Sequence, residues 1–314
     1  MKILVTAKLP YDVLKHLEGH EVDYNNTDDP LTPAELAERA KDADAVISML
    51  SDKITADFMK GCPNLKVVAN YAVGYNNIDV AAAKELGITV CNTPDVLTQA
   101  TAELGFSLMM AAGRRIVESD KFTRDRKFKG WKSDMMLGVD FYGKTIGIFG
   151  FGRIGQAVAR MAAGFNMKIL YHSRSKKYSA EMAMNASFVD FEKLLRKSDF
   201  IIITAPANEG TKHKFTMDAF KQMKPTSVLV NIGRGEIVKE SDLADALEQK
   251  LIFAAGLDVY EFEPVIEERL FALDNVVLAP HIGSGTTDTR AAMGALCCDS
   301  VLSVFAGKTP NNAL

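Results

Sequence analysis

Cysteine is scarce in this chain of 314 residues, with four cysteines in all. None of the four stands in a C-x-x-C pair or beside a histidine, which excludes the usual zinc-ligand spacings, so we expect no bound metal. The N-terminus has no export signal, because its first apolar run is too short and predicts a β-strand instead. Few cysteines without an export signal favour a reducing compartment, and we therefore expect a cytoplasmic protein.

Long apolar runs and an excess of charge of one sign are also missing. No apolar run approaches the roughly 18 residues that a membrane span needs, so we expect no membrane partner. The formal net charge of −3 gives no reason to expect a nucleic-acid partner. Hydrophobic residues make up 47% of the chain and charged residues 25%, which is typical of a globular protein. The length allows two domains of ordinary size, each with its own core.

Short apolar runs alternate with helical patterns, which is typical of parallel α/β sheets. The first part of the chain predicts a crossover helix in 32–44 and strands near residues 2–6, 21–24, 45–50, 66–70 and 88–90. A second series of six runs begins at Thr145 and predicts a larger sheet that is buried on both faces. It reads "TIGIFG", "KILYH", "DFIIIT", "SVLVNI", "AAGLDV" and "NVVLAP". Between the two series, residues 94–127 predict one long helix broken only by glycines.

A glycine-rich turn opens the second series, with Gly150, Gly152 and Gly155 in the pattern G-x-G-x-x-G and Arg153 between them. The pattern follows a strand and precedes a helix, which is the context of a dinucleotide-binding turn. The first glycine permits the tight turn, the second lets a pyrophosphate approach, and the third lets helix and strand pack closely. Free N–H groups at the helix N-terminus suit phosphates. We therefore expect a dinucleotide at this turn.

An acidic residue is missing about 20 residues further on, where Asp or Glu usually holds the adenosine ribose of such a cofactor. His172, Ser173 and Arg174 occupy that place. The absence counts against S-adenosylmethionine and against plain NAD. Arg174 and the Ser173 hydroxyl can instead hold a ribose 2′-phosphate. The sequence thus predicts NADP(H) as the preferred cofactor, with NAD(H) as a second possibility.

Reactive side chains follow three strand runs of the second series, at the edge where open parallel sheets bind ligands. These are Arg234, which stands between two glycines, Asp258 with Glu263 after it, and His281. Of the five histidines, His281 is the one at a strand end with glycines around it. The others are expected on a solvent-exposed helix and turn (His16 and His20), at the adenosine end (His172) and on a surface loop (His213).

These groups suit the reduction of a 2-oxo acid without a metal. An imidazolium such as His281 can stabilise and protonate the alkoxide that forms when a carbonyl accepts hydride. A carboxylate beside it, for which Glu263 is the better placed candidate, keeps that proton available near neutral pH. Asp258 lies nearer the strand end, where it can meet a nicotinamide amide. Arg234 offers a two-pronged grip on a substrate carboxylate.

The motifs "GFGRIG", "NIGRGEIV", "LDVYEFEP" and "PHIGSGT" together resemble the D-isomer-specific 2-hydroxyacid dehydrogenases, over nearly the whole chain. Within that family, "YHSRSKK" is similar to the glyoxylate/hydroxypyruvate reductase branch. The resemblance implies a catalytic set of Arg234, Glu263 and His281. For substrate binding it implies two of these, Arg234 and His281, with the segments Leu50–Ser51 and Val73–Gly74. Around the cofactor it implies Thr101, Ile154, Ala205, Pro206, Ile232, Asp258 and Gly283.

The resemblance also implies the architecture, an α/β fold of two doubly wound parallel-sheet domains. A Rossmann-type dinucleotide-binding domain of residues 98–283 is inserted in a smaller flavodoxin-like substrate-binding domain of residues 1–97 and 284–314. Such enzymes are commonly homodimers built through the cofactor domains and the long helix. Two other functions stay open: a dinucleotide-sensing binding protein on the same fold, and a dehydrogenase for a bulkier D-2-hydroxy acid.

Overall fold

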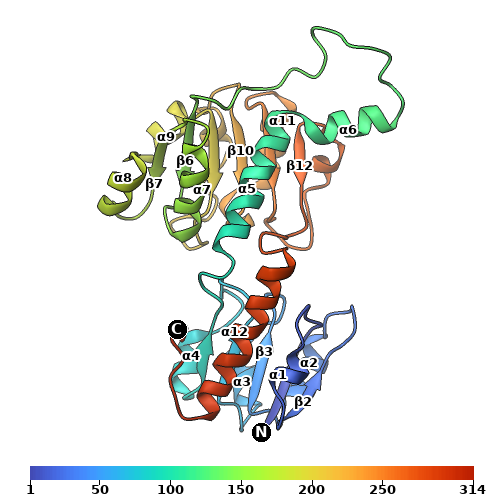
Figure 1. Ribbon diagram of the computed structural model, residues 1–314, viewed down its shortest axis with the longest axis vertical. Helices are drawn as coiled ribbons and strands as arrows, with labels where there is room; N and C mark the ends of the chain where they lie inside the picture. The colour runs from blue at the N-terminus through green and yellow to red at the C-terminus, as the bar shows by residue number, and fades with distance from the viewer. The chain divides into compact units, whose positions relative to one another are not determined.

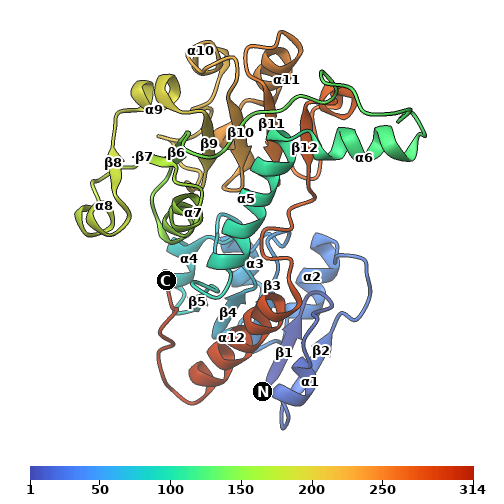
Figure 2. The ribbon, with the colours of Figure 1, turned by 45° about the horizontal axis from the view of Figure 1, so that its top comes forward.

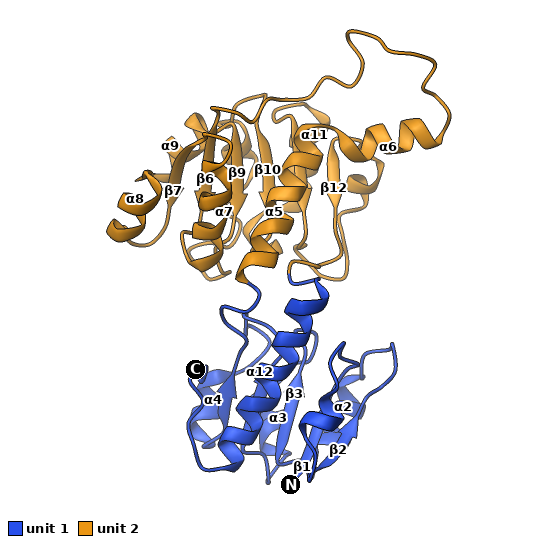
Figure 3. Ribbon diagram, viewed as in Figure 1, with its two compact units in different colours: residues 1–97, 284–314 blue, residues 98–283 orange.

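A computed structural model describes all of residues 1–314, which divide into two compact units (Figure 3). Unit 1 comprises Met1–Leu97 and Ser284–Leu314, and unit 2 comprises Thr98–Gly283. Each unit is built around one parallel β-sheet, which confirms the predicted fold class. None of the helices has the length and apolarity that a membrane crossing requires.

The sheet of unit 1 has five strands in the order β2-β1-β3-β4-β5, the flavodoxin-like order, and every neighbouring pair is parallel. The strands are β1 (Lys2–Val5), β2 (Glu21–Tyr24), β3 (Ala45–Ser48), β4 (Val67–Asn70) and β5 (Thr89–Cys91). All five predicted strands are therefore present, with bounds that differ by no more than two residues. The residues trimmed from the end of the third run, Met49 and Leu50, belong to the loop after β3.

Helices cover both faces of this sheet. The helices of the unit are α1 (Val13–His16), α2 (Pro33–Ala40), α3 (Ala56–Lys60), α4 (Val80–Glu85) and α12 (Thr287–Phe305). On one face, apolar residues of α2, α3 and α4 share a core with Leu4, Val46 and Val68. On the other face, α12 packs across β3, β4 and β5, and α1 packs on α12 (Figures 1 and 2). The C-terminal helix thus completes the core of unit 1.

The sheet of unit 2 has seven parallel strands in the order β12-β11-β10-β9-β6-β7-β8. They are β6 (Thr145–Phe149), β7 (Lys168–His172), β8 (Ala186–Phe188), β9 (Phe200–Ile203), β10 (Val228–Asn231), β11 (Ala254–Leu257) and β12 (Val276–Leu278). This is the Rossmann order with one strand added, and its order reverses between β6 and β9. All six predicted runs are strands. The edge strand β8 escaped prediction because its three residues, "ASF", form no apolar run.

Residues that alternate along these strands enter two separate cores, which explains why the runs are apolar throughout. Ile146, Ile202 and Val230 pack with α5 (Thr98–Gly113) and α7 (Arg153–Ala163) on one face. Ile201 and Leu229 pack on the other face with α9 (Phe191–Lys197), α10 (Met217–Phe220) and α11 (Glu240–Glu248). The remaining helices are α6 (Ile116–Arg124), α8 (Tyr178–Met184) and the short 3₁₀ turns η1 (Gly235–Ile237) and η2 (Glu268–Ala272).

The single helix predicted over residues 94–127 is wrong, because the segment forms two helices, α5 and α6, and starts only at Thr98. The carbonyl of Gly113 accepts a hydrogen bond from the N–H of Val139, at 2.9 Å. Arg115 then takes a left-handed backbone conformation, with φ of 55°, and its guanidinium pairs with Glu118. The packing of residues 139–141 against Gly113 therefore ends the first helix.

Candidate active site

The glycine-rich turn lies at the point where the strand order of unit 2 reverses, between β6 and β9. Gly150 has a φ of +98°, and a Cβ at this position would lie 2.5 Å from the backbone nitrogen of Ala205. The Gly150 carbonyl accepts a hydrogen bond from the Thr204 hydroxyl at 2.6 Å. The loops after β6 and β9 are thus in direct contact, and only glycine fits at the first position of the turn.

The rest of the turn leaves open the space that phosphates need. Gly152 is the N-cap of α7, no side chain caps this helix, and a Cβ on Gly152 would meet no atom within 4 Å. At Gly155, by contrast, a Cβ would overlap the Gly150 carbonyl, so the helix packs tightly onto the turn. Uncapped N–H groups beside open space suit a pyrophosphate. These residues therefore fit the diphosphate of a dinucleotide.

At the end of β7, His172 belongs to the packing of the protein itself. Its ring stacks on Phe149 and Phe188, with centroids 5.7 and 6.1 Å away, and its Nδ1 donates to the Val189 carbonyl at 3.0 Å. The Ser173 hydroxyl donates to the Ser175 carbonyl at 2.7 Å. Arg174 is exposed and has no hydrogen bond or ion pair. Of the three residues that replace the usual acid, only Arg174 has all its donors available.

Several other predicted cofactor residues meet along the carboxyl edge of the same sheet. A Cβ on Gly283 would lie 3.2 Å from both an Asp258 carboxylate oxygen and the Thr101 methyl carbon, so these three residues are neighbours. The remaining ones follow β9, β10 or the turn: Ala205 and Ile232 are buried, Ile154 is half-buried, and Pro206 and Arg153 are exposed. The sequence therefore located residues from several strand ends and α5 that gather at one edge.

The His281 imidazole and the Glu263 carboxylate form a hydrogen-bonded pair, with 2.8 Å between Nδ1 and Oε2. The other carboxylate oxygen of Glu263 accepts from the N–H of Tyr260 at 2.9 Å. Burial acts to raise the pKa of Glu263, but the hydrogen bond and charge of His281, the Tyr260 N–H and Arg234 outweigh it, and the pKa is lowered. Glu263 is thus an ionised partner for an imidazolium.

Arg234 follows β10 and has no carboxylate within ion-pair distance. One of its Nη atoms donates to the Gly233 carbonyl at 2.7 Å, and no other hydrogen bond engages the guanidinium. Burial lowers the pKa of Arg234, against the opposing charges of Glu263 and Glu236. A half-buried guanidinium with most donors free is suited to an external anion.

Two residues that the sequence reasoning missed hold these groups in place. Asn231 is buried at the end of β10, where its amide donates to the Arg234 carbonyl at 3.0 Å and accepts from the Gly233 N–H at 3.1 Å. The Tyr260 hydroxyl donates to the Ala279 carbonyl at 2.8 Å, two residues before His281. Both stand inside the motifs "NIGRG" and "LDVYEFEP", so the available signal was a polar residue within an apolar run.

Asp258 is a buried carboxylate that fixes the chain after His281. Its Oδ1 accepts from the N–H of Ile282 at 2.7 Å. Burial raises the pKa of Asp258, while the N–H groups of Ile282 and Gly283 and the His281 charge act to lower it. The sequence predicted contact between Asp258 and a nicotinamide amide. In the structure one of its oxygens is already used to anchor the backbone next to the histidine.

In unit 1, the four predicted substrate residues lie in the loops after β3 and β4. Leu50 and Ser51 are exposed, and Val73 and Gly74 are half-buried. The carbonyls of Val73 and Gly74 accept from the side-chain amides of Asn92 and Asn70, both at 2.8 Å. The backbone N–H groups of Val73 and Gly74 make no hydrogen bond within the protein. These two adjacent N–H groups are therefore available to an external acceptor.

The other histidines have structural partners. His16 lies between the Tyr11 hydroxyl and Asp299, at 2.7 and 2.8 Å, and His20 packs on Phe305. The expectation that these two are solvent-exposed is therefore wrong, since both are half-buried. His213 is paired with Glu261 at 2.6 Å. None of them belongs to the group around Glu263.

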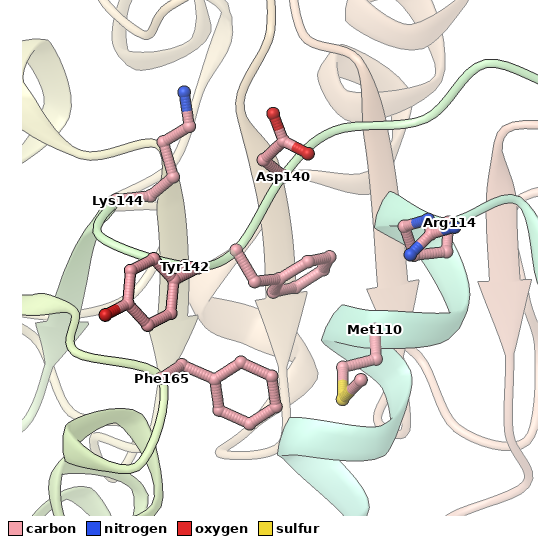
Figure 4. Close-up of a pocket in the computed structure, with 7 residues that line it drawn as sticks. Met110, Arg114, Asp140, Tyr142, Lys144 and Phe165 are labelled. Atoms are coloured by element: carbon pink, nitrogen blue, oxygen red, sulfur yellow. The ribbon is translucent and has the colours of Figure 1, made fainter.

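A cavity of about 530 Å³ in unit 2 lies away from these groups (Figure 4). Its wall includes Lys144, directly before β6, and Arg114, directly after α5. It is completed by Met110, Asp140, Phe141, Tyr142 and Phe165. Because these residues flank the amino end of β6, the cavity lies at the sheet edge opposite the glycine-rich turn, and we do not assign it to the candidate active site.

Comparison with known proteins gives matches over almost the entire chain. Residues 106–283 match the family model for the NAD binding domain of D-isomer specific 2-hydroxyacid dehydrogenases. The glyoxylate reductase of Thermococcus onnurineus is 46% identical over 314 residues, covering 98% of this chain and 94% of that protein.

Solved structures agree with this assignment. The TT0316 protein from Thermus thermophilus is 38% identical with a TM-score of 0.94, covering all of both chains. An NADPH-dependent glyoxylate/hydroxypyruvate reductase from Sinorhizobium meliloti, solved with NADP and malonate, is 31% identical with a TM-score of 0.87. It covers 100% of this chain and 96% of its own. On the shared fold and near full-length identity, the chain belongs to the D-isomer specific 2-hydroxyacid dehydrogenase family, whose enzymes use a nicotinamide dinucleotide.

Proposed function

We propose that this protein reduces a small 2-oxo acid, of the glyoxylate or hydroxypyruvate type, to the D-2-hydroxy acid. The observation that carries the proposal is the hydrogen-bonded pair of His281 and Glu263 at the carboxyl edge of the sheet that holds the dinucleotide turn. When bound, the nicotinamide cofactor supplies the hydride. All four cysteines are free thiols, which supports the cytoplasmic location predicted from the sequence.

His281 is the proton donor in this proposal. Its Nδ1 is engaged by Glu263, so Nε2 is the nitrogen left to donate a proton to the substrate carbonyl oxygen. The Glu263 carboxylate favours the doubly protonated imidazole, which provides the positive charge that an alkoxide needs nearby. Asp258 and Tyr260 hold the backbone on either side of His281 and so limit its movement.

Carboxylate-binding groups are proposed for each unit by itself: Arg234 in unit 2, and the N–H groups of Val73 and Gly74 in unit 1. The guanidinium has the planar fork that matches a carboxylate, and most of its donors are free. The two N–H groups are unpaired while their carbonyls are held by asparagines. Unit 1 is accordingly the proposed substrate-binding domain, with Leu50 and Ser51 contributing from the loop after β3.

NADP(H) is the proposed preferred cofactor, with NAD(H) as a weaker alternative. Arg174 is exposed at the end of β7 without an internal partner, and no carboxylate stands among residues 172–174 to repel a 2′-phosphate. The Ser173 hydroxyl contributes if it turns from the Ser175 carbonyl. The related reductase from Sinorhizobium meliloti is NADPH-dependent, which supports the same preference.

A homodimer is the proposed assembly. The surface of α5 and α6 carries Met110, Ile116 and Val117 with exposed fractions of 36%, 54% and 51%. The segment that follows α6 exposes Phe128, Trp131, Leu137 and Tyr142. Apolar exposure gathered in consecutive segments is typical of a surface that is covered by another chain. The cavity of Figure 4 lies beside it and shares Met110 and Tyr142.

The first prediction concerns substrate and cofactor choice. Glyoxylate, hydroxypyruvate, pyruvate, phenylpyruvate and 2-oxoisocaproate are each assayed with NADPH and with NADH. We expect the highest kcat/KM with glyoxylate or hydroxypyruvate and NADPH. One charge-assisted hydrogen bond from Arg174 supplies about one to two decades of cofactor preference. NADPH binding without turnover of any substrate would identify a sensor, and a preference for phenylpyruvate would identify the bulkier substrate class.

The proposed role of Arg174 in cofactor choice is tested by one variant and one control. Arg174→Ala should weaken NADPH binding by about 10- to 100-fold and leave NADH binding unchanged. Arg160→Ala removes an exposed arginine from α7 and should change neither constant. A clear NADH preference in the unmodified protein contradicts the assignment of Arg174.

The second prediction concerns the acid pair. His281→Ala should lower kcat for reduction by about 10² to 10⁴, the usual contribution of a positioned acid. In Glu263→Gln, kcat should also fall, because the neutral amide no longer stabilises a protonated imidazole beside the forming alkoxide. The pKa of Glu263 is lowered, mainly by the hydrogen bond and charge of His281 acting against burial, so its carboxylate is charged at neutral pH. An unaltered kcat in the Gln variant would remove Glu263 from the mechanism.

The third prediction concerns Arg234. Arg234→Lys keeps the charge but loses the planar fork, so kcat/KM for the 2-oxo acid should fall by about 10- to 100-fold. The dissociation constant of NADPH, measured by fluorescence titration, should stay the same. Equal losses in both quantities would make Arg234 a cofactor-binding or purely structural residue.

The fourth prediction concerns assembly. Sedimentation should give about twice the chain mass of 34.3 kDa. Val117→Asp should shift the protein toward the monomer, because a carboxylate would be buried in an apolar contact. Leu14→Asp is the matched control, since Leu14 is also 51% exposed but lies on α1. A monomeric unmodified protein, or equal effects of both variants, speaks against an interface on α5 and α6.

A further inference from the structure

Two loops of unit 1 are tied together by the side-chain amide of Asn77. Its Nδ2 donates to the carbonyls of Met49 and Asp52, both at 3.0 Å, in the loop after β3. Because backbone carbonyls only accept, the orientation of this amide is fixed by chemistry. Asn77 itself stands in the segment after β4, three residues beyond Gly74. Together with the backbone hydrogen bond from the Ile54 N–H to the Asn77 carbonyl, at 2.9 Å, this side chain connects the segment that carries Val73 and Gly74 to the neighbouring loop.

Asn70 extends the connection from inside the sheet. This residue ends β4 and is completely buried. Its Nδ2 donates to the Gly74 carbonyl at 2.8 Å, while its Oδ1 accepts from the Ser48 hydroxyl at 3.1 Å and from the Asn77 amide at 3.2 Å. The ends of β3 and β4 are therefore joined through two asparagines whose amides are both engaged. A polar network satisfied in this way is rigid.

The buried carboxylate of Asp52 anchors the loop after β3. Asp52 Oδ2 accepts from the N–H of Met49 at 2.7 Å and from the hydroxyl of Thr6, which follows β1. Met49 is therefore held by its N–H through Asp52 and by its carbonyl through Asn77. Between Met49 and Asp52, the N–H groups of Leu50 and Ser51 make no hydrogen bond within the protein. The loop is fixed at both ends and offers free donors in the middle.

We propose that Asn77, acting with Asn70, is a positioning residue for substrate carboxylate binding. It holds the loop after β3 and the Val73–Gly74 segment at one separation, so that the unpaired N–H groups of both are presented in a single geometry. The inference rests on the proposed function, because it assumes a carboxylate-bearing substrate. Asn77 touches neither substrate nor cofactor in this account. Its effect passes through the loop backbone.

The test compares Asn77→Ala with Asn76→Ala, the exposed neighbour whose side chain makes no hydrogen bond. KM and kcat for the 2-oxo acid are measured with NADPH, together with the inhibition constant of oxamate, a non-reacting carboxylate. We expect KM and the oxamate constant to rise together by about tenfold in Asn77→Ala, the equivalent of one misplaced charge-assisted hydrogen bond. The NADPH dissociation constant should not change, and Asn76→Ala should match the unmodified protein.

Asn70→Ala gives a second measurement on the same network. The proposal can therefore still be tested if Asn77→Ala does not fold. Both asparagines act through the same loops, so the rise in KM of the double variant should be less than the product of the two single effects. An unchanged KM in Asn77→Ala beside an active control, or parallel losses in NADPH binding, overturns the positioning role alone. An unmodified protein that turns over no 2-oxo acid overturns the proposed function, and the positioning role falls with it.

Discussion

The parallel direction of every strand is the constraint on which the candidate site residues of each unit depend. In a parallel sheet all carboxyl ends meet at one edge, and the loops that leave this edge lie side by side. In unit 2 that edge brings together Gly150, Arg234 and the segment from Asp258 to His281, although these residues are far apart in the sequence. In unit 1 it brings together the loops after β3 and β4. If the strands were not parallel, the motifs within each unit would not lie close together.

Buried polar side chains then fix the positions of the loops that the sheet edge brings together. Asn231 shapes the turn that carries Arg234, and Asp258 and Tyr260 hold the chain around His281. Each bonds to backbone rather than to the reactive group itself. A backbone anchor restricts the position of the loop and leaves the reactive side chain free to engage a ligand. In unit 1, likewise, the side-chain amides of Asn70 and Asn92 donate to the carbonyls of Gly74 and Val73. The backbone N–H groups of Val73 and Gly74 stay unpaired.

Sequence reasoning succeeded where a residue type serves one physical purpose. Gly150 needs a positive φ, and the apolar strand runs need two buried faces, so both could be located from the sequence. It failed where tertiary contacts decide. The break after α5 depends on Val139 bonding to Gly113, and β8 depends on the edge of an existing sheet. Asn231 and Tyr260 were overlooked because a polar residue inside an apolar run shows its role only when its bonding partners are known.

At the end of β7, freedom from internal partners distinguishes Arg174, the proposed binding residue, from His172, which belongs to the packing of the protein. His172 stacks on two phenylalanines and donates to Val189, so replacing it disturbs the end of the strand before it alters any ligand contact. Arg174 makes no such bonds, and its guanidinium can direct all its donors to a ligand. The same contrast distinguishes Arg234, with one backbone bond, from Arg115, whose donors are taken by Glu118. In this chain, an unpaired arginine at a strand end therefore indicates an anionic ligand more strongly than an arginine that is paired with a carboxylate of the protein.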